Sequence, residues 1–313
     1  MFRNKEYILS VYQEGGFTKA AERLFVSQPS LSASIKRIEE KVGAPIFDRS
    51  SNPISLTEVG VEYVKYALDI QEKEKDFARY MSDHTNLMTG KIRIGGSSFF
   101  SSFVLPKLIS EFTAKHSKIR FEIYEDSTKN LMSSLSAGNL DVIIDNAINE
   151  NDNIVSEVYS SELLLLAVPK GLKINDELTK FRMTAQEIKD GKHFDDKKSV
   201  SLSVFKDQPF ILLNPENDTG KRAEKLFKKY GITPNVIFHL DQQVTAYNVS
   251  CSGMGVSFVS DTLVKYIDAE RDIYYYRLPD LQAKRNIYFY QKKNHYLSLA
   301  SRKFIEYNTS VKV

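Results

Sequence analysis

The side chains best suited to recognition chemistry lie in one short stretch, SQPSLSASIKRIEE, at positions 27–40. Its small hydroxylated residues can bond phosphate oxygens or base edges, and Gln28 is long enough to pair with an adenine edge. The basic residues Lys36 and Arg37 follow and suit phosphate groups. The chemistry available here is hydrogen bonding and charge pairing rather than bond cleavage.

Sequence patterns typical of enzymes and metal sites do not occur in the chain. The histidines at positions 84, 116, 193, 239 and 295 are scattered, with no H-x-x-x-H spacing, and no G-x-S-x-G, Walker A or G-x-G-x-x-G motif occurs. The single cysteine, Cys251, excludes an internal disulfide and a C-x-x-C metal site, and its apolar surroundings indicate a buried structural thiol. We expect no enzymatic activity, no metal and no cofactor.

The hydroxylated stretch needs a helix to present it. Ser27 is a good N-cap, and Pro29 is tolerated in a first turn. The apolar residues Leu31, Ile35, Ile38 and Val42 form one stripe, and the opposite face holds Pro29, Ser32, Ala33, Lys36 and Arg37. A plain amphipathic helix with a solvated back is the alternative interpretation of this pattern.

A second short helix and a small wing flank this one. Thr18 can cap KAAERLF, and only two residues separate that helix from Ser27, which is typical of a helix-turn-helix. Large side chains at the start of the second helix would hold it away from the major groove, whereas small hydroxyls permit close approach. Extended pieces at 46–49 and 54–56 flank a turn at 50–53 and predict a wing that carries Arg49.

The stretch from Phe17 to Gly60 resembles the N-terminal winged helix-turn-helix of LysR-type transcriptional regulators, with a nearly continuous match. The resemblance implies base and phosphate contacts at Ser27, Gln28, Pro29, Ser30, Ser32 and Arg49. One departure is Ala33, where many members carry arginine. The full predicted DNA-binding set is Thr18, Ser27, Gln28, Pro29, Ser30, Ser32, Lys36, Arg37 and Arg49.

Residues 57–88 contain no proline and one glycine, and they predict a long helix capped by Thr57. Spacings of four and three residues relate Tyr63, Ala67, Ile70, Glu74, Phe77, Met81, His84 and Met88, close to the ~3.5-residue period of a coiled-coil seam. The stripe could pack against the chain's own body or against a partner. LysR-type regulators dimerise through this helix, so the resemblance implies dimer contacts at Tyr63, Ile70, Phe77 and Met81.

From residue 91 onward, strands alternate with helices, which predicts parallel βαβ units and a two-lobed α/β domain. This pattern resembles the effector-binding domain of LysR-type regulators, which is like a periplasmic binding protein. The predicted fold is therefore an all-α winged helix-turn-helix (1–58), a linker helix and hinge (59–90) and a two-lobed effector domain (91–313). Lobe I takes about 91–162 and 272–313, and lobe II about 163–271.

Ligands of such sheets bind beyond the carboxyl ends of the strands, where helix N-termini point. Hydroxyls follow the first two strands at these ends and suit a small anion, although they could be simple helix caps. The predicted effector-binding residues are Ser97, Ser98, Ser127 and Thr128 in lobe I and Asn217, Thr219 and Gln243 in lobe II. The polar segment 171–207 is longer than the usual family connection, and within it we expect EIKDGKHFDDKK (187–198) to be an exposed excursion. The segment could add a lid, a dimer contact or nothing functional.

Together these features predict a LysR-type regulator controlled by a small anionic effector bound between two lobes. The resemblance implies a homodimer that pairs into a homotetramer on a double-stranded DNA operator with inverted half-sites. The alternatives are a DNA-binding protein whose C-terminal domain only oligomerises and an enzyme on a binding-protein-like fold.

The net charge of +3 neither demands nor excludes a nucleic-acid partner. No apolar run approaches 18 residues, so no membrane helix is expected, and the N-terminus lacks a signal-peptide pattern, which predicts a cytoplasmic protein.

Overall fold

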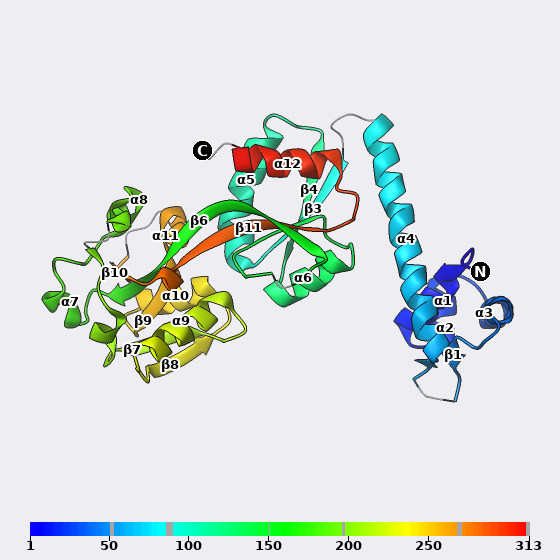
Figure 1. The fold of residues 1–313 in the computed structure, drawn as a ribbon, viewed down its shortest axis with the longest axis horizontal. Helices are drawn as coiled ribbons and strands as arrows, with labels where there is room; N and C mark the ends of the chain where they lie inside the picture. The colour runs from blue at the N-terminus through cyan, green and yellow to red at the C-terminus, as the bar shows by residue number, and fades with distance from the viewer. Residues whose placement is uncertain (51–52, 86–89, 150, 196–197, 268–270, 311–313) are drawn as a thin grey trace. The chain divides into compact units, whose positions relative to one another are not determined.

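The computed structural model describes residues 1–313 except 51–52, 86–89, 150, 196–197, 268–270 and 311–313 (Figure 1). Its Cα positions divide into two compact units, Met1–Ser82 and Asp83–Val313. Each unit has its own hydrophobic core, so each is described by itself.

The first unit is a helix-turn-helix with a wing. Its helices are α1 (Lys5–Glu14), α2 (Phe17–Arg23), α3 (Gln28–Val42) and α4 (Glu58–Thr85). The wing pairs β1 (Phe47–Asp48) with β2 (Ser55–Leu56) in antiparallel register. Gly60 in α4 is required by this packing, because a Cβ there would lie 2.0 Å from the Ile46 carbonyl oxygen.

Local capping explains where these helices begin. The Ser27 side chain accepts a hydrogen bond from the Ser30 main-chain N–H at 3.4 Å, and Thr57 accepts one from the Gly60 N–H at 2.9 Å. These two caps are as predicted. Thr18 is not a cap, because α2 begins at Phe17 with Gly16 at the N-cap position. The first turn of α2 therefore lies two residues earlier than the sequence pattern indicates.

The second unit is built on one nine-stranded sheet in the order β4-β3-β5-β11-β6-β9-β7-β8, with β10 paired to β6. The strands are β3 (Gly90–Gly96), β4 (Ile119–Glu125), β5 (Val142–Asp145), β6 (Ile154–Pro169), β7 (Pro209–Leu213), β8 (Asn235–Leu240), β9 (Val256–Ser260), β10 (Ile273–Arg277) and β11 (Lys284–Lys292). The main helices are α5 (Leu105–Thr113), α6 (Thr128–Ser136), α9 (Asp218–Lys229), α10 (Gln243–Cys251), α11 (Asp261–Tyr266) and α12 (Leu299–Ser310). A π-helical turn, Phe100–Val104, leads into α5.

Two long antiparallel strands connect the two lobes of this unit (Figure 1). Lobe I holds the parallel strands β4, β3 and β5, and lobe II holds the parallel strands β9, β7 and β8. Strand β6 pairs with β11 over Ile154–Leu163 and then with β9 over Leu164–Ala167. The predicted two-lobed architecture is confirmed.

Two details of the lobe assignment differ from the sequence prediction. Strand β10 was expected in lobe I, but it pairs with residues 165–169 of β6 and so belongs to lobe II. Residues 187–198 were expected to be exposed, but the segment 171–207 that contains them folds into short helices, α7 (Ile174–Glu177) and α8 (Ala185–Lys189), and 3-10 turns at Lys192–Phe194 and Leu202–Phe205. Its Ile188 and His193 are fully buried against lobe II.

Candidate nucleic-acid interface and ligand cleft

Helix α3 buries one face and leaves the other open. Leu31, Ile35 and Ile38 belong to the core of the first unit. The predicted contact residues Gln28, Pro29, Ser30, Lys36 and Arg37 are all exposed, Ser27 is exposed at the cap, and Ser32 is half-buried. Within the part of the chain that the structure describes, the side chains of Gln28, Lys36 and Arg37 have no hydrogen-bonding or ionic partner. Their hydrogen-bonding groups remain available to an external partner.

Arg49 is held in the wing by two contacts. Its guanidinium lies 3.1 Å from Glu39 Oε2 and 5.2 Å from the centre of the Phe17 ring. The other oxygen of Glu39 accepts the Ile46 main-chain N–H at 2.8 Å, so the carboxylate fixes the wing as well as Arg49. These contacts limit the side-chain freedom that Arg49 would lose on contacting a phosphate.

The turn between α2 and α3 contains a residue that the sequence analysis did not single out. Phe25 has φ = 55° and a side chain 95% exposed to solvent. The two-residue gap in the sequence predicted the turn, but no local pattern indicates that an aromatic residue takes the left-handed conformation there.

Helix α4 divides the predicted dimer contacts into two groups. Tyr63 is 4% exposed, stacks on Phe2 at 4.8 Å between ring centres, and donates to the Met1 carbonyl oxygen. It therefore packs into its own unit, which corrects its assignment to a partner-facing seam. Farther along, Ile70 is half-buried, whereas Phe77 is 64% and Met81 44% exposed.

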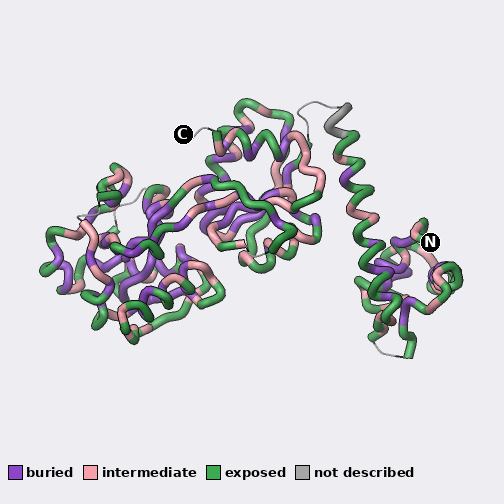
Figure 2. The backbone as a smooth tube through the Cα atoms, in the orientation of Figure 1, coloured by how far each residue is buried: buried purple, intermediate pink, exposed green. Residues whose placement is uncertain are grey.

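The buried positions of α4 are concentrated in its first turns (Figure 2). Ala67 is buried there, and Glu74 is bonded to Lys5 at 2.8 Å. The side chain of His84 and all of Met88, two further members of the predicted stripe, lie outside the described residues. The apolar members that are exposed, Phe77 and Met81, therefore lie beyond Ile70, and the exposed part of the stripe is shorter than predicted.

A cavity of about 440 Å³ lies along α4 between Tyr66 and Phe77. Its lining includes Ile70 and Phe77 from the predicted stripe and also Tyr66, which was not predicted. Tyr66 and Tyr80 are exposed apolar residues of the same helix. Phe77, Tyr80 and Met81 are exposed side chains on this part of α4, and they form an apolar surface there.

Between the lobes of the second unit lies a cavity of about 610 Å³. Lobe I contributes Thr128, Lys129, Ala147 and Ile148. Lobe II contributes Pro215, Glu216, Asp218, Lys221, Arg222 and Lys225, with Gln282 from the turn before β11. Of the seven predicted effector-binding residues, only Thr128 lines this cavity.

Two of the lobe I hydroxyls, those of Ser127 and Thr128, have partners within the protein. Ser127 is the N-cap of α6, accepting the Asn130 N–H at 3.3 Å. Thr128 donates its hydroxyl to Asp145 Oδ2 at 2.9 Å, so this hydrogen is not free for an anion in the observed arrangement. Ser97 and Ser98 are half-buried at the end of β3 and outside the cavity lining.

The predicted lobe II residues are likewise engaged within the protein. Asn217 caps α9 by accepting the Thr219 N–H at 3.0 Å. The Thr219 hydroxyl accepts from Arg285 at 2.9 Å, and Gln243 accepts from Ser260 at 3.2 Å. These contacts give all three residues structural roles beside the cavity.

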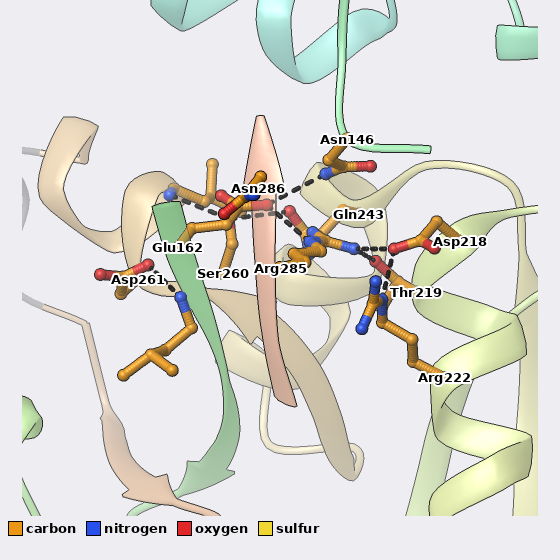
Figure 3. Close-up of polar contacts among 12 residues, drawn as sticks. Asn146, Glu162, Asp218, Thr219, Arg222, Gln243, Ser260, Asp261, Arg285 and Asn286 are labelled. Atoms are coloured by element: carbon orange, nitrogen blue, oxygen red, sulfur yellow. Dashed lines mark hydrogen bonds and ion pairs between the residues drawn. The ribbon is translucent and has the colours of Figure 1, made fainter. Parts of the chain in front are cut away.

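A buried ionic network centres on Arg285 at the crossing of the lobes (Figure 3). Its guanidinium lies 2.7 Å from Glu162 Oε1 and 2.9 Å from Asp218 Oδ2. Asn146, at the end of β5 in lobe I, donates to the same Glu162 oxygen at 3.0 Å. Burial opposes the charge on Arg285, but the Glu162 and Asp218 carboxylates together raise its pKa.

Asp145 is a second buried charge beside the cavity. It accepts the main-chain N–H groups of Asn146 and Ala147 at 2.7 and 2.9 Å in addition to the Thr128 hydroxyl. Burial raises the pKa of Asp145 despite these bonds and the nearby Arg285 charge. The proton affinity of this carboxyl therefore differs between the folded and unfolded chain.

A third buried contact joins the 171–207 segment to the end of β9. His193 Nε2 lies 2.9 Å from Asp261 Oδ2, and Asp261 Oδ1 accepts the Leu163 N–H at 2.8 Å. Burial raises the pKa of Asp261, but His193 and Lys265 outweigh it and the net shift is downward. The segment is thereby anchored to the strand that connects the lobes.

Cys251 is half-buried, and burial raises the pKa of its thiol. Among the described residues, no three His, Cys, Asp or Glu side chains are arranged to hold a metal ion. No described helix is both long and apolar enough to cross a bilayer.

Two family models match the chain. The model described as a bacterial regulatory helix-turn-helix protein of the lysR family matches residues 2–61, and the LysR substrate binding domain matches residues 85–311. The chain belongs to the LysR family. It is a DNA-binding transcriptional regulator with an effector-binding domain, as predicted, and the family is one of regulators rather than enzymes.

Known proteins of this family cover nearly the whole chain. An uncharacterized HTH-type transcriptional regulator, YcgK of Bacillus subtilis (strain 168), is 26% identical over 303 residues, covering 96% of this chain and 91% of its own. The solved structure of full-length BenM has a TM-score of 0.56 at 22% identity and covers 99% of this chain and 96% of its own. That of full-length CbnR complexed with its target DNA has a TM-score of 0.62 at 20% identity and covers 100% of both chains. These structural likenesses show that the LysR fold extends over both units.

Proposed function

We propose that this LysR-type regulator binds a double-stranded operator with inverted half-sites through α3, as a homodimer that pairs into a homotetramer. The observation that carries the proposal is the outward face of α3, where the Gln28, Lys36 and Arg37 side chains have no partner among the described residues. A helix with small residues at its leading end can enter the major groove. The similar CbnR was solved complexed with its target DNA.

The control step of the proposal is the binding of a small anionic molecule in the interlobe cavity. The cavity is lined from both lobes, so a ligand there contacts two bodies at once. A ligand changes an equilibrium only if it binds one arrangement of the protein more tightly than another. Contact with both lobes is the simplest source of such a difference.

Exposed apolar residues support the oligomer. Phe77 and Met81 expose apolar side chains on α4. In the effector domain the two edge strands also expose apolar side chains, Ile123 on β4 and Ile237 and Phe238 on β8. Edge strands with exposed apolar residues are suited to contacts between chains.

The DNA contacts are tested with two substitutions. Gln28→Ala should weaken binding to the specific operator by roughly 1–3 kcal/mol if Gln28 makes a bidentate base contact. Lys36→Ala should weaken binding to all sequences equally and reduce the salt slope by about one unit. The matched control is Lys65→Ala, because Lys65 is exposed on α4 and paired to Glu62. Specific and nonspecific affinities that stay at the wild-type level in both variants contradict the proposed docking.

The effector hypothesis competes with two alternatives, a C-terminal domain that only oligomerises and an enzyme on this fold. A thermal-shift screen of small carboxylates, amino acids and aromatic acids, followed by DNA footprinting with each hit, separates the three. A ligand-dependent change in the footprint supports the regulator. A footprint that no ligand changes favours oligomerisation alone, and turnover of a bound compound points to an enzyme.

A further inference from the structure

The interlobe cavity carries an excess of positive charge. Four basic residues line it, Lys129, Lys221, Arg222 and Lys225, against the acidic residues Glu216 and Asp218. Arg222 is neutralised within the protein, because its Nε lies 2.7 Å from Asp218 and its Nη1 donates to the Gln282 carbonyl oxygen at 2.8 Å. Asp218 also contacts Arg285, whose second carboxylate partner is Glu162. The two positive charges of Arg222 and Arg285 are therefore balanced by the two negative charges of Asp218 and Glu162.

The three lysines of the cavity remain unbalanced. Lys129, Lys221 and Lys225 have no hydrogen-bonding or ionic side-chain partner within the described residues, and all three are exposed. Glu216 is the one lining carboxylate left to oppose them. The cavity therefore has a surplus of about two positive charges, and a hollow lined by one sign of charge concentrates ligands of the other sign.

These lysines come from both lobes. Lys129 is the second residue of α6 in lobe I, whereas Lys221 and Lys225 lie one turn apart on α9 in lobe II. At the N-terminus of α6, Asp126 already accepts the Ser127 N–H at 2.7 Å, so the attraction for an anion there rests on Lys129. In lobe II, the Asp218 carboxylate offsets the positive end of the α9 dipole, so the attraction for an anion there comes from Lys221 and Lys225.

We propose that the effector is a small molecule with two separated anionic groups, one held by Lys129 and the other by Lys221 and Lys225. This inference rests on the proposed function of the cavity as the effector site. A dianion that bridges the lobes binds best when both ends are in reach, so it favours one separation of the lobes over others. A monoanion contacts one lobe and lacks that preference, and so it shifts the lobe equilibrium little.

Matched pairs of ligands test the charge requirement with the full chain. The first pair is fructose 1,6-bisphosphate and fructose 6-phosphate, and the second is succinate and butyrate. Calorimetry should show that at least one compound with two anionic groups binds at least tenfold more tightly than its counterpart with one. The pair that shows this difference tells whether the anionic groups are phosphates or carboxylates.

Substitutions on α9 test where the ligand binds. Lys221→Ala/Lys225→Ala should weaken the bound dianion at least tenfold, and Lys129→Ala should weaken it by a smaller factor. The matched control is Lys228→Ala, because Lys228 is exposed on the same helix but outside the cavity lining. All four lysines are at the surface, where substitutions have little effect on stability.

Three results overturn the inference: neither compound with two anionic groups binds, each binds no better than its counterpart with one anionic group, or Lys228→Ala weakens binding as much as the double variant. Its failure is distinguishable from failure of the proposed function. If an uncharged or singly charged compound changes the DNA footprint and Lys221→Ala/Lys225→Ala responds normally, only the dianion inference fails. If no compound of any class changes the footprint, the proposed effector control itself fails.

Discussion

At the scale of single residues, Phe25 has a backbone conformation that does not suit its residue type. Its φ of 55° lies in the left-handed region, which costs an L residue other than glycine, asparagine or aspartate roughly 1–2 kcal/mol. Its ring is 95% exposed and so contributes little to packing. We expect Phe25→Asn to raise the free energy of unfolding of residues 1–82 by about 1 kcal/mol, measured by urea denaturation.

The control for this prediction keeps the backbone strain. Phe25→Ala removes the exposed ring but leaves an L residue with Cβ at positive φ, so its stability should remain near that of the wild type. If alanine stabilises as much as asparagine, the benefit comes from losing the ring and the strain argument is wrong.

Asp145 gives a prediction for the dependence of stability on pH. Because burial raises its pKa in the folded state, the folded chain holds this proton to higher pH than the unfolded chain does. The wild type is therefore most favoured at low pH and loses stability as the pH rises above about 4, where a free aspartate titrates. Between pH 4 and pH 7 the free energy of unfolding of the wild type should therefore fall relative to that of Asp145→Asn.

An exposed aspartate supplies a control of opposite sign. The Asn130 side chain and the Ser127 N–H lower the pKa of Asp126, so its contribution is present above the usual titration range and is lost as the pH falls. The free energy of unfolding of Asp126→Asn should therefore fall relative to that of the wild type as the pH rises. Parallel pH profiles for the two variants would show that burial of Asp145 does not govern its ionisation.

Residue roles that depend on neighbours in sequence could be predicted, and those that depend on the fold could not. Ser27 caps α3 through Ser30, three residues away, so the cap was visible in the sequence. The partner of Thr128 is Asp145, 17 residues away on another element. The three lysines of the cavity were missed for the same reason, because a lysine on a helix usually faces solvent.

At the scale of elements, hydrophobic periodicity predicted most helices and strands but not every pairing. The pattern indicated that β10 is a strand, yet its partner depends on how far β6 extends. Strand β6 runs over 16 residues into lobe II and pairs there with β10. For 187–198, polarity predicted exposure, but Ile188 is buried. The short helices of this region have too few turns for such an isolated apolar residue to show a helical period.

Helix α4 supports a prediction about assembly. Phe77 lies at the centre of the exposed apolar surface, where an aspartate would have to be buried without a partner on association. Phe77→Asp should abolish the dimer and tight operator binding, because a single protomer supplies only one half-site contact. Light scattering measures the first effect and an operator titration the second.

Leu68→Asp is the control for Phe77→Asp. Leu68 is an exposed apolar residue of the same helix but lies off the line of Ile70, Phe77 and Met81. Its variant should keep the wild-type oligomer. If Phe77→Asp also retains the wild-type mass and operator affinity, α4 is not the dimer surface.

At the scale of the whole molecule, the candidate DNA interface and the ligand cavity lie in different compact units. The two units have separate hydrophobic cores, so a change in one core need not alter the stability of the other. Within the second unit, Arg285 joins residues of both lobes, with Asn146 reaching it through Glu162 from lobe I and Asp218 contacting it from lobe II (Figure 3). Arg285 is therefore the place to test whether the units are independent.

Arg285→Met removes the charge that balances two carboxylates, of which Asp218 keeps Arg222 as a partner and Glu162 keeps only a neutral amide. Breaking a buried ion pair on one side destabilises a protein by about 3–5 kcal/mol, because the remaining charge stays buried. Hydrogen exchange measured by mass spectrometry should be faster than in the wild type for peptides from residues 83–313. It should be unchanged for peptides from residues 1–82. Adding Glu162→Gln neutralises the stranded carboxylate and should restore part of the protection. Equal loss of protection in both units would show that they unfold together. A loss of unfolding free energy below about 1 kcal/mol would show that Arg285 does not hold the lobes together.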